Sequence, residues 1–204
     1  LWDDVSGDAA TGTLPDISDD GRFVVFRSNS SNLVVGDTND SMDIFVRDRQ
    51  ESVTFRTNLT STGAETADIP WHLEGFLGGL SSANGRYVAF TSVNADLVPG
   101  DTNNQTDVFV RDLRNNTTTR VSVTSEGDQS PMGTASDITN VSISSTGRFI
   151  AFHSYSRLHP DDTDGVCGIG GDRDGVKHRG AGQRRGDVHS RSDQVIIDRH
   201  TYPR

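Results

Sequence analysis

Three short runs along the chain have polar and apolar residues in the same order, and each run contains a glycine. The runs read DDGRFVVF, ANGRYVAF and STGRFIAF, and their glycines are Gly21, Gly85 and Gly147. A polar residue followed by Gly suits a two-residue hairpin turn, because Gly adopts positive φ at no steric cost. The residues after each turn are apolar at odd and even positions alike, which predicts a strand buried on both faces.

Each of these strands belongs to a longer repeat, because the three glycines lie 64 and 62 residues apart. β-Branched and aromatic residues dominate the other apolar runs of the repeat, and no helical apolar stripe of useful length occurs. The pattern therefore predicts about four short antiparallel strands in each repeat. The further strands are expected before the turn at 14–17, 77–80 and 140–143, after an acidic loop at 43–48 and 107–112, and finally at 52–57 and 117–123.

The repeat decides between the possible all-β architectures. A lone four-stranded sheet with apolar residues on both faces cannot bury them, whereas sheets stacked around an axis can. The sequence thus predicts an all-β chain of propeller blades within residues 1–164, with repeats at about 14–58, 77–124 and 138–164. A sandwich or barrel of unrelated strands is the alternative, but it leaves the repeat unexplained.

The repeated phrase carries a family resemblance. ISDDGRFVVFRS followed by DIFVRD is similar to the WD40-like (PD40) repeat of TolB-type propellers, in which a Ser-Pro-Asp-Gly turn precedes the strand. The resemblance covers about residues 14–153 and departs from the family where Asp19, Ala83 and Ser145 replace the proline. It implies a periplasmic or extracellular propeller that binds other proteins through its loops and axial face. Function does not follow from this fold, which scaffolds, receptors and enzymes share.

The number of blades is incomplete. Propellers have about four to eight blades, whereas this chain shows two complete repeats and the first half of a third. After the strand at 149–152 the chain reads GVCGIGGDRDG where a DVFVRD-like strand would be expected. Residues 165–204 are rich in Gly and Arg, and we expect them to be a disordered basic tail or the product of a reading-frame slip. Closing such a propeller requires either the blades that are missing here or self-association of the chain.

Composition narrows the classes of partner. The chain of 204 residues has a formal net charge of −10, and the acidic excess lies in residues 1–164. An acidic body disfavours nucleic acids and anionic membrane surfaces as partners. No window approaches the roughly 18 apolar residues of a membrane span, and no charged-then-apolar leader follows Leu1. The single cysteine, Cys167, excludes an intrachain disulfide and is expected to be an incidental free thiol.

The acidic loops are the best candidates for chemistry. They read GDTNDSMD at 36–43 and GDTNNQTD at 100–107, so oxygen ligands stand at positions 1, 3 and 7 as at the start of a calcium-binding loop. Position 6, where such a loop needs Gly, is Met42 and Thr106, so the alternative is that the loop aspartates cap tight turns. A third loop, DDTD at 161–164, keeps the acidity. The candidate calcium ligands are Asp37, Asn39, Asp43, Asp101, Asn103 and Asp107.

Other catalytic patterns do not occur in the sequence. His72, His153 and His159 are not spaced as a zinc pair, and no G-x-S-x-G nucleophile elbow exists. Trp71 lies in an apolar segment between the first two repeats, where it either packs under a blade or forms the lip of a binding site. We therefore predict no catalytic residue.

These observations favour a non-catalytic protein-interaction or scaffold propeller that is exported to the periplasm or outside the cell. Two alternatives stay open. One is a calcium-supported hydrolase or lactonase acting at the axial channel, which would require acidic ligands that converge on the axis. The other is a truncated gene product without an independent function.

Overall fold

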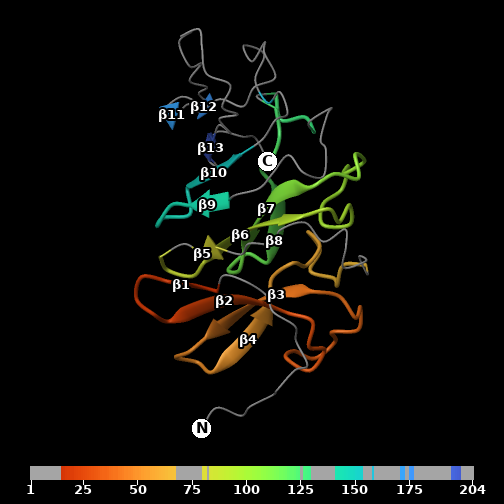
Figure 1. Ribbon diagram of the computed structural model, residues 1–204, viewed down its shortest axis with the longest axis vertical. Helices are drawn as coiled ribbons and strands as arrows, with labels where there is room; N and C mark the ends of the chain where they lie inside the picture. The colour runs from red at the N-terminus through yellow and green to blue at the C-terminus, as the bar shows by residue number, and fades with distance from the viewer. Residues whose placement is uncertain are drawn as a thin grey trace, which may run out of the picture.

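The structure is a computed structural model that describes residues 15–67, 80–81, 83–124, 126–129, 141–153, 158, 171–172, 175–176 and 194–198. Within these residues every regular element is a β-strand, and the strands form antiparallel sheets stacked along the long axis of the molecule (Figure 1). The predicted all-β fold of an incomplete propeller is confirmed. In the part of the chain that is described, no helix is long and apolar enough to cross a membrane.

Two of the sheets, here called blade 1 and blade 2, are four-stranded meanders in which each strand pairs with the next. Their registers are equivalent, because Phe23 lies opposite Asp48 in blade 1 and Tyr87 lies opposite Asp112 in blade 2. The sequence repeat is therefore also a repeat of backbone pairing. Blade 1 consists of β1 (Asp16–Ile17), β2 (Phe23–Ser28), β3 (Asp43–Asp48) and β4 (Val53–Arg56), and blade 2 of β5 (Leu80–Ser81), β6 (Tyr87–Ser92), β7 (Asp107–Asp112) and β8 (Thr117–Arg120).

Blade 3 has three strands in the order β9 (Val141–Ile143), β10 (Phe149–His153) and β13 (Gln194–Asp198). Phe149 lies opposite Asp198, which is the register of the equivalent strands in blades 1 and 2. Residues 193–198 spell DQVIID, which has an Asp at each end like DVFVRD.

The position of β13 differs from the sequence-based expectation that the repeat stops before residue 165. A third strand does occur, but residues 154–193 separate β13 from β10, so the 62–64-residue period does not locate it. The boundary at 164/165 stays a prediction. Within the segment, β11 (Gly171–Asp172) and β12 (Gly175–Val176) form a separate two-stranded ribbon.

The core consists of two apolar layers, one in each gap between blades. Successive side chains of a strand point to opposite faces, so β6 supplies Val88 and Phe90 to one gap and Tyr87 and Ala89 to the other. Blade 2 is thereby buried on both faces, as the sequence predicts for these strands. The first layer is formed by Val25, Ile44, Val46, Val88, Phe90, Leu97, Val98 and Phe109, and the second by Tyr87, Ala89, Val108, Val110, Val121, Ile150, Phe152 and Leu158.

In blades 1 and 2, the arginine after the turn glycine ties the first hairpin to the end of the third strand. Arg22 Nη2 lies 2.6 Å from Asp48 Oδ2, and Arg86 Nη2 lies 2.8 Å from Asp112 Oδ2. Both arginines also donate through Nε to the same carboxylate, which makes the pairs bidentate. The hydrogen bond from Arg22 lowers the pKa of Asp48 to about 2.

Candidate functional site

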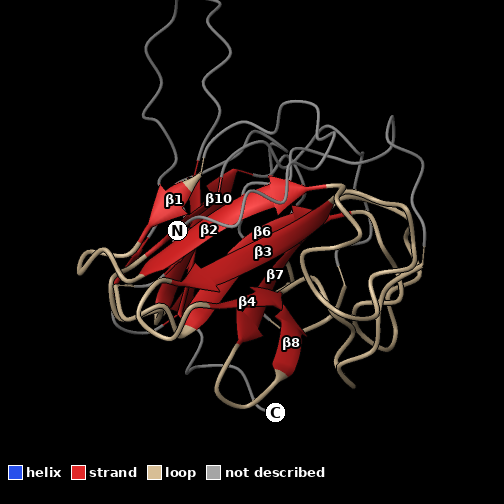
Figure 2. Cartoon of the chain, turned by 90° about the horizontal axis from the view of Figure 1, so that it is seen from below, coloured by secondary structure: helices blue, strands red, loops and turns tan. Residues whose placement is uncertain are grey.

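The two acidic loops connect the second and third strands of blades 1 and 2, and they lie together at one end of the sheets, among the loops drawn in tan (Figure 2). Their backbones are equivalent. Gly36 and Gly100 have φ of 84° and 78°, and Asp40 and Asn104, four residues later, have φ of 53° and 52°. Positive φ at Asp and Asn is tolerated because their short polar side chains bond locally.

In blade 1 the acidic loop is closed by Arg56, the last residue of β4. Its Nη1 lies 3.1 Å from Asp37 Oδ1, 3.1 Å from Asp43 Oδ2 and 2.6 Å from Glu65 Oε1. The side chains of Arg56 and Asp43 are only 7% and 1% exposed. A single buried guanidinium therefore pairs with carboxylates from the loop, from β3 and from the segment after β4.

Blade 2 repeats this arrangement with one substitution. Arg120 Nη1 lies 3.4 Å from Asp101 Oδ1 and 3.7 Å from Asp107 Oδ2. Gln129 takes the place of Glu65: its Oε1 accepts from the backbone N–H and the hydroxyl of Thr102, and its Nε2 donates to Asp101. The ion pairs of blade 2 are thus fewer and longer than those of blade 1.

Within these clusters, burial raises the pKa of the carboxyl groups, whereas a nearby arginine lowers it. Burial raises the pKa of Asp37, and the carboxylate of Asp43 raises it further, while Arg56 opposes the increase. Burial would also raise the pKa of Glu65, but hydrogen bonds from Thr38 and Arg56 outweigh it and lower that pKa to about 2. In blade 2, burial raises the pKa of Asp107. The carboxylates therefore depend on their arginine and on local donors to remain charged.

The predicted calcium ligands are placed in two different ways. Asp37 and Asp43 meet around Arg56, and Asp101 and Asp107 meet around Arg120. The ion pairs supply the positive charge that a calcium ion would otherwise bring. Within the described residues, no group of three or more His, Cys, Asp or Glu side chains could hold a metal.

Each of the two asparagines of the candidate set closes a turn in its own loop, and Asn39 Nδ2 also donates to the backbone carbonyl of Thr66 at 3.4 Å. Asn39 Oδ1 accepts a hydrogen bond from the backbone N–H of Ser41 at 3.1 Å, and Asn103 Oδ1 accepts one from Gln105 N–H at 3.0 Å. These are Asx-turn contacts. The calcium site itself stays a prediction, and Asp161, Asp162 and Asp164 of the third loop lie outside the described residues, as do Trp71, His72, His159 and Cys167.

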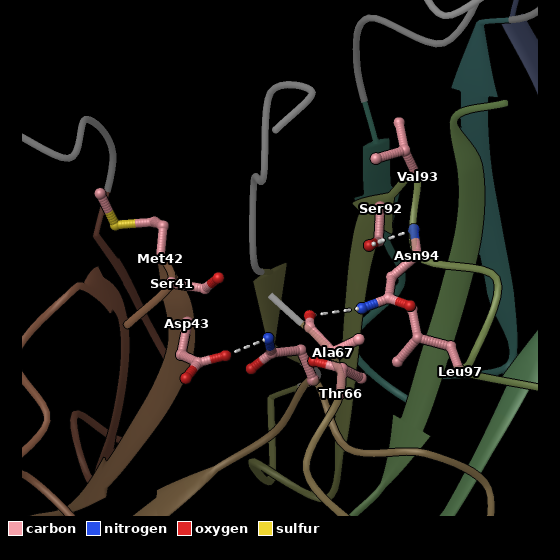
Figure 3. A pocket seen from close by; sticks show the side chains of 10 residues that line it. Ser41, Met42, Asp43, Thr66, Ala67, Ser92, Val93, Asn94 and Leu97 are labelled. Atoms are coloured by element: carbon pink, nitrogen blue, oxygen red, sulfur yellow. Dashed lines mark hydrogen bonds between the residues drawn. The ribbon is translucent and has the colours of Figure 1, made fainter. Parts of the chain in front are cut away.

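Asp43 also helps to enclose a small pocket between blades 1 and 2 (Figure 3). Asn58 Nδ2 donates to Asp43, and across the pocket Asn94 Nδ2 donates to the backbone carbonyl of Ala67 at 3.1 Å. The volume is about 20 Å³, which is the scale of a water molecule rather than of a substrate. The pocket thus belongs to the packing of the two blades.

A larger hollow opens on the rim, where blades 1 and 2 diverge. This rim groove has a volume of about 590 Å³. Phe55 of β4 lines one side and is 42% exposed, and the loop residue Val35 is fully exposed. Leu113 and the buried Arg111 line the side formed by blade 2. The remaining lining residues are Val34, Gly36, Thr54, Arg56, Leu59, Gly63, Glu65 and Asn116.

The rim groove depends on a difference between the repeats. The exposed positions of β4 carry Val53 and Phe55, whereas the equivalent positions of β8 carry Thr117 and Thr119. Sequence reasoning missed both this difference and the two closing arginines. A signal for the arginines exists, because Arg56 and Arg120 are 64 residues apart, as are the turn glycines Gly21 and Gly85.

The chain is similar to solved propellers over part of its length. TolB from Acinetobacter baumannii matches with 16% identity and a TM-score of 0.38, over 68% of this chain and 25% of that one. The β-propeller domain of the Trilobed protease from Pyrococcus furiosus matches with 13% identity and a TM-score of 0.43, over 72% and 34%. A TolB-type protein from Agrobacterium tumefaciens matches with 19% identity and a TM-score of 0.39, over 76% and 42%.

This chain spans between about a quarter and two fifths of the length of those structures. No protein-family model and no curated protein matches it. The fold assignment therefore rests on the three stacked sheets of the chain itself.

Proposed function

We propose that the chain is a non-catalytic protein-interaction or scaffold module of a propeller, exported to the periplasm or outside the cell, and that it binds an extended segment of a partner protein in the rim groove. The observation that carries the proposal is the rim groove itself. It combines exposed apolar side chains with the outer edge of blade 1, because among the described strands β4 pairs only with β3.

An extended peptide suits this groove for two reasons. An edge strand presents free backbone groups to which a peptide can add as a further strand, and pockets beside the edge then select alternate side chains. Phe55 is 42% exposed on that strand and lines the groove together with Val35 and Leu113, so the groove offers apolar contacts next to the edge.

The clusters around Arg56 and Arg120 support a structural role for the acidic loops rather than a catalytic one. Each cluster recurs at an equivalent position of its blade and has its charges paired internally. The acidic composition supports a protein partner over a nucleic acid. The excess of carboxylates over lysine also suits an exported protein.

A library of random peptides displayed on phage and panned against the purified chain tests the proposal. We expect enrichment of sequences that alternate apolar and polar residues, because alternate side chains of an added strand point into the groove. Phe55→Asp should lose at least tenfold in affinity for an enriched peptide. Thr119→Asp, the same change at the equivalent place in blade 2, is the matched control and should bind like the wild type. The proposal is wrong if no sequence is enriched, or if Phe55→Asp and Thr119→Asp bind equally well.

A further inference from the structure

A glycine-to-aromatic contact joins each blade to the next. A Cβ atom at Gly85, in the first turn of blade 2, would lie 2.0 Å from the ring of Phe23 in blade 1. A Cβ atom at Gly147, in the first turn of blade 3, would lie 2.1 Å from the ring of Tyr87 in blade 2. Since real Cβ atoms do not approach so closely, the turn backbone of one blade packs directly on the aromatic ring of the preceding blade.

The two ends of the stack each hold one half of this contact without the other. Gly21 is the equivalent glycine of blade 1, and among described residues a Cβ there would meet only Arg49 at 3.8 Å and Ile17 at 4.0 Å. Phe149 is the equivalent aromatic residue of blade 3, and it is 39% exposed, whereas Tyr87 is 8% exposed. Gly21 thus lacks an aromatic partner in the described chain, and Phe149 lacks a turn glycine.

The apolar side chains beside Gly21 are also less buried than their equivalents in blade 2. Val88 and Phe90 of blade 2 are fully buried against blade 1, but their equivalents Val24 and Phe26 are only half-buried. Alternation along β2 directs these two side chains away from the face that carries Val25, which packs on blade 2. In Figure 1 blade 1 and blade 3 lie at opposite ends of the stack, with blade 2 between them.

The two end faces are complementary by repetition. Between blades 1 and 2, one face of blade 2 packs on the face of blade 1 that carries Phe23 and Val25. The outer face of blade 1, with Gly21, Val24 and Phe26, is equivalent to that face of blade 2.

The outer face of blade 3 carries Phe149 and Ala151, which are equivalent to Phe23 and Val25. The Gly21 face of blade 1 could therefore pack on the Phe149 face of blade 3 in the way that blade 2 packs on blade 1.

We propose that a second copy of this chain docks head to tail, with the Gly21 face of each copy packed on the Phe149 face of the other. Because the two faces differ, the contact is heterologous, and such contacts close into a ring when the rotation permits. The described residues of two copies form six blade sheets, within the range of about four to eight blades in propellers, whereas those of three copies form nine.

Light scattering after size-exclusion chromatography of the full chain tests the proposal. We expect a mass twice the 22.1 kDa of one chain. Phe26→Asp and Phe149→Asp should each give a monomer, because a carboxylate cannot be buried unpaired in either contact. Val53→Asp is the matched control: Val53 is as exposed as Phe149 but lies away from both end faces, so this variant should remain a dimer.

Mixing the two monomeric variants separates a lost contact from a lost fold. The Phe149→Asp chain keeps its blade 1 face, and the Phe26→Asp chain keeps its blade 3 face, so the mixture should form a one-to-one dimer with a single contact. A monomeric wild type would overturn the proposal, as would a mixture that stays monomeric or a dimer that only one of the two variants disrupts. A mass beyond the dimer would overturn ring closure.

Discussion

Blades 1 and 2 share the repeated sequence phrases and have equivalent strand pairing, yet they differ in burial. All six residues of β6 are buried, whereas in β2 only Val25 and Ser28 are. The difference comes from the neighbours, because blade 2 is packed between two sheets and blade 1 is packed against one. A blade sequence therefore encodes a sheet with two apolar faces, and its place in the stack decides how much free energy those faces contribute.

The arginines at the end of the third strand show the same contrast. Arg111 in blade 2 is 2% exposed and donates to the carbonyl of Thr60, in the segment that follows blade 1, and to Thr118 Oγ1. Burial lowers the pKa of its guanidinium. Arg47 in blade 1 is half-buried and donates to Thr54 Oγ1 at 3.2 Å. The same side chain is thus enclosed only where an adjoining segment supplies a carbonyl.

The comparison can be tested by paired substitutions at equivalent positions. The stability measurements that follow use the Phe149→Asp background, in which the proposed association between copies is blocked. Urea unfolding midpoints report the differences between the paired variants.

The largest expected difference is between Phe90→Ala and Phe26→Ala. Phe90 is fully buried in the layer between blades 1 and 2, so its truncation should cost about 3–5 kcal/mol of the free energy of unfolding. Phe26 stacks on Phe45 in the way that Phe90 stacks on Phe109, but it is only half-buried, and we expect about half that cost. Equal costs at the two positions would show that the adjoining blade does not decide the contribution.

The second comparison removes the arginine that closes each acidic loop. Arg56→Gln should lower the free energy of unfolding by about 3 kcal/mol, because it leaves Asp37 and Asp43 buried without a counter-ion. Arg120→Gln should cost about half as much, since its ion pairs are longer and Gln129 still donates to Asp101. A larger loss for Arg120→Gln would contradict this ranking of the two clusters.

The same variants test the calcium hypothesis. If Arg56 supplies the positive charge of the loop, millimolar calcium should leave the thermal midpoint of the wild type unchanged. It should raise the midpoint of Arg56→Gln by a few degrees, because an ion that binds only the folded state stabilises it. A rise in the wild type that Asp37→Asn abolishes would instead establish the predicted calcium site.

A further paired comparison is that of Gly85→Ala with Gly21→Ala. Both glycines have positive φ, 65° and 69°, so either alanine should cost about 1–2 kcal/mol of backbone strain. Only at Gly85 would the new Cβ atom also overlap a ring, that of Phe23, which adds about 1–3 kcal/mol for overpacking. Similar midpoints for the two variants would mean that Gly85 is not in close contact with blade 1.

The smallest effect concerns pH. The folded-state pKa of Asp48 is lowered to about 2, below the unfolded value of about 3.9. Its contribution to stability is therefore present above about pH 4 and is lost as the pH falls toward 2. Asp48→Asn should lose less stability than the parent between pH 5 and pH 2, whereas Asp40→Asn, on an exposed loop position, should follow the parent curve. An unchanged acid slope in Asp48→Asn would contradict the role given to the Arg22 pair.

The strands of blades 1 and 2 and their order could be predicted from the sequence, because the apolar runs, turn glycines and repeat period all indicate the same elements. The partial burial of β2 could not be predicted, because its apolar pattern is the same as that of β6. The two strands differ in burial only because β6 has a sheet on each side. β13 was missed because a long insertion separates DQVIID from β10. The acidic loops were recognised, but their arginine partners were not, because Arg56 and Arg120 lie on another strand and meet the loops only in the folded sheet.

Amide hydrogen exchange followed by mass spectrometry tests the central claim most directly, namely that neighbouring blades rather than blade sequence determine local stability. Exchange rates report the free energy of local opening. In the Phe149→Asp background, the account predicts that peptides from β6 and β7 exchange at least tenfold more slowly than the equivalent peptides from β2 and β3. Equal protection of the two blades, or slower exchange in blade 1, would contradict it.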